Sequence, residues 1–190
     1  MQEEVESRTV NLAISTSKLS ARTIVSAVKA YLNHRKNVKV KKPWVIPLIL
    51  FMLVLSPAEM LLSKAVFGST YIDHVLGRID VPGLDQLPLL LFSQIVSVLG
   101  EEIEFRAFFV GKGMKRFSFW PAAIAGAVLF AAAHYAAGEA GIVAWDLAGI
   151  FIDAVLFAIL YRKTGNCLIS FIPHFVSNML GFFLVPVIFA

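Results

Sequence analysis

Five apolar stretches, each close to the length needed to cross a membrane, dominate the sequence. A transmembrane helix needs roughly 20 apolar residues to cross about 30 Å of hydrocarbon. With 58% hydrophobic residues and a mean hydropathy of +0.76, the chain is far more apolar than an ordinary soluble domain. We therefore predict an all-α polytopic transmembrane helix bundle of about five spans. The stretches are residues 44–62, 88–110, 120–137, 142–161 and 167–189.

Basic residues gather where these stretches would meet one side of the membrane. Lysines and arginines precede the first stretch, follow the second between residues 112 and 116, and follow the fourth at Arg162 and Lys163. The opposite side has only Lys64 and Arg78, among several aspartates. Because positively charged loops stay in the cytoplasm, we expect a multi-pass protein of the cell membrane with a cytoplasmic N-terminus. Topology accounts for the net charge of +4, so we expect no nucleic-acid partner.

The chain divides into a basic cytoplasmic N-terminal segment, residues 1–42, and a transmembrane bundle, residues 43–190. The first segment lacks the basic and apolar regions of a secretory signal. Within it, residues 19–36 place apolar side chains on one helical face and most basic side chains elsewhere. Two interpretations stay open for this part: an interfacial helix on the cytoplasmic leaflet, or a loose basic tail.

The second stretch contains the charged segment GEEIEFR, residues 100–106. If the span ended before this segment, the apolar run from Leu87 to Gly100 would give about 21 Å of helix, too short to cross. Extending the span through Val110 restores its length. It also places ionisable groups inside the span. Inserting each charge near the middle of the membrane costs about 2.5–3.5 kcal/mol. Such groups persist where they are paired and face an interior; a re-entrant or juxtamembrane segment is the alternative.

Helical spacing pairs two charges of this segment and turns another acid inward. Glu102 and Arg106 are four residues apart, close enough for a supporting ion pair that keeps the local charge balanced. About 100° around the helix, other polar residues form one stripe. The stripe consists of Gln94, Ser97, Glu101 and Glu104. We therefore expect Glu101 to face the interior of the bundle.

Polar residues in later stretches add groups to this interior. His134 follows Phe130 by one turn in the alanine- and glycine-rich third stretch, where close helix packing would hold a catalytic group. His174 and Asn178 are one turn apart in the fifth stretch. Two of these residues have a simpler interpretation. His134 would be a hydrogen-bonded core histidine, and Asn178 would be an amide that joins two helices.

The remaining candidates are two aspartates and one cysteine. Asp146 and Asp153 are seven residues apart in the fourth stretch. They would line a wet funnel or neutralise an interior cation, and the sequence does not separate these roles. Cys167 is the only cysteine, which excludes an intramolecular disulfide and predicts a small core residue.

Together these groups suit hydrolysis of an acyl bond by activated water. Glu101 would act as the general base, and His134 would help to hold and polarise the water. His174 and Asn178 would donate hydrogen bonds to the developing oxyanion. No GxSxG motif is present, so a covalent serine nucleophile is not favoured.

Two other interpretations stay open from the residues alone. Glu101, His134 and His174 would together supply a catalytic zinc site, although HExxH is absent. A non-enzymatic membrane component, such as an ion path or a partner-binding bundle, would also keep acids in its interior. The chain shows no internal repeat or matched broken helices of the kind that transporters have.

Three short motifs, in order along the chain, resemble those of a known family. They are EExxxR at Glu101, Glu102 and Arg106, FxxxH at Phe130 and His134, and HxxxN at His174 and Asn178. In this order they resemble the CPBP intramembrane proteases, the CAAX protease and bacteriocin-processing family, which includes the type II CAAX prenyl endopeptidases. The resemblance covers residues 88–182, and LYRKTGN before the last motif is similar to the family's usual turn.

This resemblance implies an intramembrane endopeptidase that acts at the lipid bilayer. Its substrate would be a membrane-associated peptide or protein, with or without a prenyl group, cleaved near its C-terminus or membrane anchor. The resemblance also implies a glutamate mechanism without a cofactor, in the roles given above to Glu101, His134, His174 and Asn178; zinc is not excluded. The chain departs from the family pattern at Ala107, Glu104 and Asp153. These departures leave the catalytic set intact but put the family's substrate in doubt.

Overall fold

The computed structural model describes residues 42–77 and 86–189, and every regular element in these ranges is helical. A short 3-10 turn, η1 (Lys42–Trp44), leads into α2 (Val45–Phe67) and α3 (Ser69–Leu76). One continuous helical rod then passes through α4 (Leu87–Glu101), the π-helix η3 (Glu102–Val110) and α5 (Gly111–Gly113). The last helices are α6 (Phe119–Ala133), α7 (Ala140–Thr164) and α8 (Cys167–Phe189).

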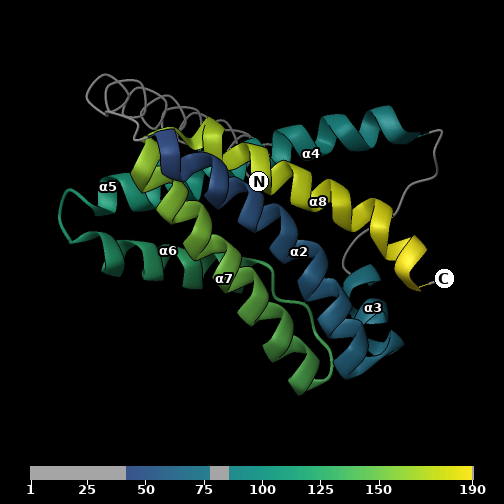
Figure 1. The fold of residues 1–190 in the computed structure, drawn as a ribbon. Helices are drawn as coiled ribbons and strands as arrows, with labels where there is room; N and C mark the ends of the chain where they lie inside the picture. The colour runs from purple at the N-terminus through teal and green to yellow at the C-terminus, as the bar shows by residue number, and fades with distance from the viewer. Residues whose placement is uncertain (1–41, 78–85, 190) are drawn as a thin grey trace, which may run out of the picture.

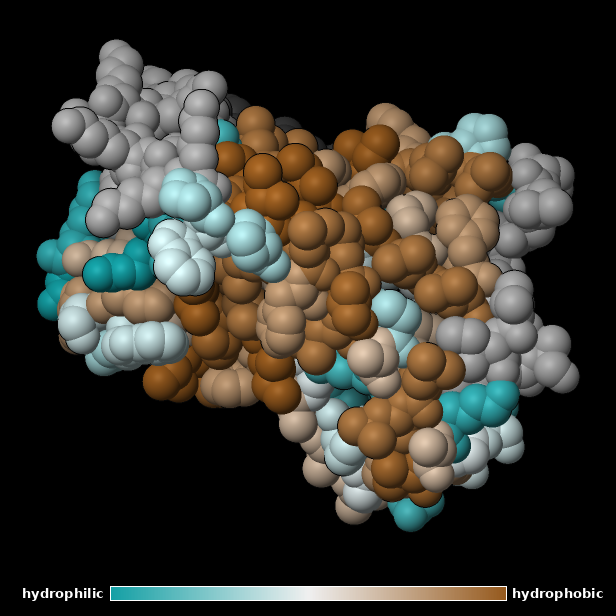
Figure 2. Space-filling view, viewed as in Figure 1, coloured by the Kyte–Doolittle hydropathy of each residue, from teal (hydrophilic) through white to brown (hydrophobic). Residues whose placement is uncertain are grey.

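Three of these helices, α2, α7 and α8, are long and apolar enough to cross a membrane, and α6 is a shorter apolar helix. Figure 2 shows apolar residues over much of the viewed face, with hydrophilic residues gathered near α5 and near α3. Large apolar side chains of α2 are exposed, an arrangement that suits lipid rather than water. They include Ile46, Leu50, Phe51, Val54, Leu61, Leu62 and Val66. The predicted all-α membrane bundle is therefore confirmed.

The helices alternate in direction, which gives the bundle two chemically different ends (Figure 1). The packing centres on α7 and α8: α7 contacts α2, α6, α8 and η3, and α8 contacts α2, α3, α4, α7 and η3. One end, here called the basic end, is formed by residues 112–116 and by Arg162 and Lys163. The other end, here called the α3 end, contains α3 and the start of α7.

A buried apolar cluster closes the basic end. It includes Val110, Phe119, Tyr161 and Cys167, none of them more than 7% exposed. Cys167 is thus the small core residue that the sequence predicts. Gly165 makes the preceding turn, because its φ of +62° is left-handed and strains residues with a Cβ atom.

The structure departs most from the predicted stretches in three places. Helix α2 continues past residue 62 to Phe67 as one α-helix, although Pro57 lies inside it. Helix α6 ends at Ala133 rather than at residue 137, which leaves His134 as its C-cap. The reason is local: the His134 backbone N–H bonds the Ala131 carbonyl, while its ring bonds the Phe130 carbonyl that a longer helix would use.

The third difference is α3, which the sequence analysis did not predict. Gly68, with a φ of 63°, separates α3 from α2 and permits the sharp change of direction. The interfacial helix considered for residues 19–36 lies outside the described residues. The division between residues 42 and 43 stays a prediction.

Candidate active site

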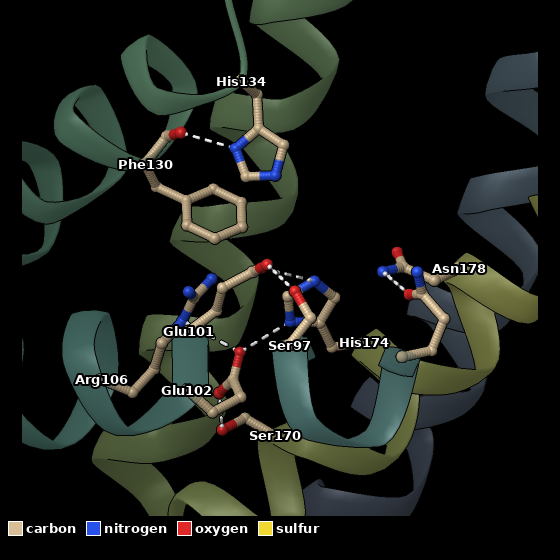
Figure 3. A network of polar contacts seen from close by, with 10 residues as sticks. Ser97, Glu101, Glu102, Arg106, Phe130, His134, Ser170, His174 and Asn178 are labelled. Atoms are coloured by element: carbon tan, nitrogen blue, oxygen red, sulfur yellow. Dashed lines mark hydrogen bonds and ion pairs between the residues drawn. The ribbon is translucent and has the colours of Figure 1, made fainter. Parts of the chain in front are cut away.

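A cavity of about 370 Å³ lies inside the bundle, lined by α2, α3, α4, α6, α7 and α8. The four residues predicted to act on a substrate, Glu101, His134, His174 and Asn178, all line it. They come from three helices that are far apart in sequence, and Figure 3 shows them around one space. Tertiary packing therefore brings the predicted residues together.

Glu101 ends α4 and presents its carboxylate to the cavity (Figure 3). Its Oε1 accepts a hydrogen bond from Ser97 Oγ at 3.1 Å. Its Oε2 lies 3.5 Å from His174 Nε2, and this oxygen is buried without a hydrogen bond from the described residues. A buried carboxylate oxygen requires a donor, so Oε2 is the atom of this site best suited to bind and deprotonate a water molecule.

Glu102 is fully buried beside Glu101 and holds three neighbours. His174 Nδ1 donates to its Oε1 at 2.9 Å, and Arg106 Nε lies 3.4 Å from the same oxygen. Ser170 Oγ donates to its other oxygen. The predicted ion pair of Glu102 and Arg106 is present, and it forms part of a larger network that joins η3 to α8.

The guanidinium of Arg106 lies between two aromatic rings. Its central carbon is 4.6 Å from the centre of the Phe130 ring and 4.9 Å from that of Phe157. Its two terminal nitrogens are buried and donate no hydrogen bond to the described residues. Attraction between a desolvated cation and aromatic faces offsets part of this cost, so Phe130 and Phe157 hold the arginine in place.

His174 and Asn178 each contact a residue of another helix that the sequence analysis did not name as their partner. The His174 ring stacks on Phe157 at 4.6 Å and points one nitrogen at each glutamate. Asn178 Nδ2 donates to Gln94 Oε1 at 3.2 Å. Because an amide nitrogen has two hydrogens, Asn178 can keep this bond and still donate to a substrate.

His134 lies at the α3 end of the cavity, beyond the last turn of α6. Its Nδ1 is 2.8 Å from the Phe130 carbonyl oxygen, and a carbonyl can only accept, so Nδ1 is the protonated nitrogen. In the neutral ring, Nε2 is then an acceptor. This tautomer suits a residue that accepts a hydrogen bond from the attacking water.

Glu104 is a correction to the predicted polar stripe. Gln94, Ser97 and Glu101 line the cavity as a stripe, whereas Glu104 is exposed and lies outside the cavity lining. The cause is the π-helix that begins at Glu102. Its i to i+5 hydrogen bonds turn each residue by a smaller angle than an α-helix does, which rotates Glu104 away from the stripe.

The two aspartates of α7 have separate positions. Asp153 lines the cavity, whereas Asp146 is buried outside the lining and holds α3. Tyr71 donates to Asp146 at 3.4 Å, and His74 Nε2 lies 3.6 Å from its other oxygen. Through this attachment, Tyr71 and two apolar residues of α3 form a wall of the cavity. The available signal was the spacing of Ile72 and Val75, which are three residues apart and so share a helical face, but two residues are too few to be distinctive.

Residues 83–180 match the model of the family described as type II CAAX prenyl endopeptidase Rce1-like. The match covers more than half of the chain and contains all three motifs. The chain belongs to this family. Membership confirms the predicted relationship to the CAAX proteases and makes the protein, in general terms, a CAAX-type intramembrane protease. The parts of the cavity wall from α2 and α3 lie outside the region matched to the Rce1-like model.

No curated protein and no solved structure matches the chain. Among the described residues, no group of three or more histidine, cysteine, aspartate or glutamate side chains is arranged to hold a metal ion. Glu101, His134 and His174, the set considered for zinc, share the cavity without forming such a group.

Proposed function

We propose that this Rce1-like protein is a glutamate-dependent intramembrane endopeptidase. It hydrolyses a peptide bond near the C-terminus or membrane anchor of a membrane-associated or lipidated substrate. The observation that carries the proposal is the Glu101 Oε2 atom, which is buried at the cavity without a hydrogen bond from the described residues and faces His174 Nε2. A nucleophilic water bound there would receive its activation from a carboxylate already oriented by Ser97.

In the proposed reaction, the water oxygen attacks the carbonyl carbon while Glu101 takes one of its protons. The Nε2 atom of His134 accepts the other water hydrogen as a hydrogen bond and fixes the direction of attack. The carbonyl oxygen becomes an oxyanion, which accepts hydrogen bonds from Asn178 Nδ2 and from His174 Nε2, the His174 ring then carrying a proton on both nitrogens. When the intermediate collapses, the C–N bond breaks and Glu101 returns its proton to the leaving amine nitrogen.

Glu102 and Arg106 act as positioning residues in this scheme. Because Glu102 accepts from His174 Nδ1 at 2.9 Å, it orients the ring so that Nε2 faces the cavity. The same principle orients the histidine of a serine protease triad through a buried carboxylate. Arg106 offsets part of the negative charge that two adjacent glutamates bring into the bundle.

The proposal includes a location and a partner. The protein would cross the cell membrane several times with its N-terminus in the cytoplasm, since the basic end carries the positively charged loops. Its partners would be the lipid bilayer and a membrane-associated peptide or protein substrate, with or without a prenyl group. No cofactor takes part in the proposed mechanism.

The test is cleavage of quenched-fluorescent peptides, prenylated and unprenylated, by the reconstituted protein. The Glu101→Gln variant should lose activity by about 10²- to 10⁴-fold, the usual contribution of a general base, and His134→Ala should lose much of it. Glu104→Gln is the matched control, because this nearby glutamate is exposed outside the cavity. Activity that survives Glu101→Gln would contradict the mechanism, and activity lost on adding a zinc chelator would assign the chemistry to a metal.

A further inference from the structure

We propose that Asp153 binds a positively charged side chain of the substrate, a lysine or an arginine close to the bond that is cleaved. The inference rests on the proposed function and specifies its substrate class. It depends on three features of the described residues: the position of Asp153 in the cavity wall, the absence of a contact partner for its carboxylate, and the balance of charge around the glutamates.

Asp153 belongs to the same cavity as the proposed catalytic groups. It lies in the middle of α7, and the cavity lining includes Ile150 before it and Phe157 after it on this helix. Ionisable residues within membrane spans are rare, and they usually face an interior cavity and pair with another polar or charged group. Asp153 meets the first condition, so its carboxylate is placed where a bound substrate can reach it.

The second condition is not met within the described part of the chain. There the Asp153 carboxylate makes no hydrogen bond and no ion pair. Arg106 and His174 act on it electrostatically, but their contacts go elsewhere. Arg106 Nε lies 3.4 Å from Glu102, and the two ring nitrogens of His174 face Glu101 and Glu102. The structure therefore favours the cavity wall over an interior ion pair, the two roles that the sequence did not separate.

The described residues do not balance the charge of this interior. Arg106 is within electrostatic reach of three carboxylates, those of Glu101, Glu102 and Asp153. A proton on both nitrogens of His174 would add one positive charge, which still leaves three carboxylates against two cations. Among the described residues, the cavity lining contains no lysine or arginine. Because an uncompensated charge away from water is costly, a cation bound at Asp153 would be stabilised.

A further carboxylate adds to the negative potential around Asp153. Glu59 of α2 acts electrostatically on Asp153, and its Oε2 lies against Gly149, one turn before Asp153 on α7. Glu59 is outside the cavity lining, so it would act at a distance rather than by contact. Two carboxylates on neighbouring helices repel each other, and a cation bound at Asp153 would offset this repulsion.

The surroundings of Asp153 suit an organic cation carried by a polypeptide. In the part of the chain that the structure describes, no group of three or more potential ligands is arranged to hold a metal ion. One carboxylate is enough to bind an ammonium or a guanidinium group. Met60, Ile72 and Val75 line the same cavity and would contact the aliphatic part of a lysine or arginine side chain. Because Glu101 shares this cavity of about 370 Å³, the cation belongs to a residue near the scissile bond.

Peptide variants measure this preference. In a quenched-fluorescent peptide that the protein cleaves, each residue near the cleaved bond is replaced in turn by lysine and by norleucine, which has a similar shape but no charge. At one position, lysine should raise kcat/KM over norleucine by about 10-fold or more, the usual contribution of a hydrogen bond to a charged group. Asp153→Asn should abolish this preference, and Asp153→Glu should retain it. Asp73→Asn, at an exposed position outside the cavity lining, should also retain it.

A second measurement does not depend on proteolysis. Octylamine, which is positively charged at neutral pH, and octanol, which is uncharged, are added separately to the purified protein in detergent. Binding to the folded protein raises its melting temperature. Octylamine should raise it more than octanol does in the wild type and in Asp73→Asn. In Asp153→Asn, the two compounds should have equal effects.

Each outcome decides the inference. Where a peptide is cleaved, a lysine preference that is absent from the wild type, or that Asp153→Asn keeps, would overturn it while leaving the proposed function intact. Where no peptide is cleaved, the proposed function fails and the octylamine measurement decides. An octylamine effect that Asp153→Asn removes would then support the cation site, and equal effects in both proteins would overturn it. The two failures are therefore distinguishable.

Discussion

Replacing Glu102 by glutamine tests the idea that this buried carboxylate holds the site together. Glu102 is fully buried and serves Arg106, His174 and Ser170 at once. Glutamine keeps the shape of the side chain but removes the charge, and its amide nitrogen cannot accept a hydrogen bond. At least one donor then loses its acceptor, and the charge of Arg106 is left without its ion-pair partner.

The size of the effect follows from this burial. Removing one partner of a buried ion pair typically costs about 3–5 kcal/mol, because the other charge stays buried and uncompensated. This is a large fraction of the roughly 5–15 kcal/mol by which domains are stable. At about 2–4 °C per kcal/mol for a chain of this size, the melting temperature should fall by about 6–20 °C.

Thermal unfolding of the purified protein in detergent measures the change. Glu104→Gln makes the same chemical substitution at an exposed position of the same π-helix, so its melting temperature should equal that of the wild type. The double variant Glu102→Gln with Arg106→Met should recover part of the loss, since it removes the unpaired cation as well. If Glu102→Gln melts at the temperature of Glu104→Gln, the network does not stabilise the bundle and the reasoning fails.

Two further variants test other parts of the fold. Asp146→Asn should loosen α3, because a hydrogen bond to a charged acceptor contributes about 1.5–3 kcal/mol to stability. Amide hydrogen exchange of residues 69–76 should then accelerate. Asp73→Asn, at an exposed position of α3, should leave the exchange unchanged. Equal exchange rates in both variants would contradict the idea that Asp146 attaches α3 to α7. Gly165→Ala should lower the free energy of unfolding by about 1–2 kcal/mol, since its φ is +62°. Gly141→Ala, in a helix with open space around it, should not lower it, and equal effects in denaturant titrations would contradict the turn argument.

The sequence predicted the parts of this site that depend on spacing within one helix. Residues four apart meet on a helix whatever surrounds it, so the pairing of Glu102 with Arg106 followed from the sequence alone. The apolar stretches predicted the helical bundle for the same reason. Their ends were less accurate, because His134 ends α6 through hydrogen bonds that no apolar pattern records.

Contacts between helices were beyond sequence reasoning. Glu102 meets His174 across 72 positions of the chain, and Asn178 meets Gln94 across 84. Such pairs depend on how the helices rotate against one another, which a single sequence does not specify. For this reason the sequence analysis placed His174 beside Asn178 at an oxyanion but did not predict that the Glu102 carboxylate also holds its ring.

Because of the π-helix η3, the geometry of the site depends on the number of residues in this segment as well as on which residues they are. Within hydrocarbon, a broken helix would leave backbone N–H and C=O groups without partners. A π-helix instead keeps its backbone hydrogen-bonded and rotates the following residues around the helix axis, which is also the effect of inserting one residue into an α-helix. A deletion of one residue between Glu101 and Arg106 would therefore disturb the site more than most substitutions. In the evolution of such proteins, insertion and deletion in this segment would be suppressed even where side chains are free to vary.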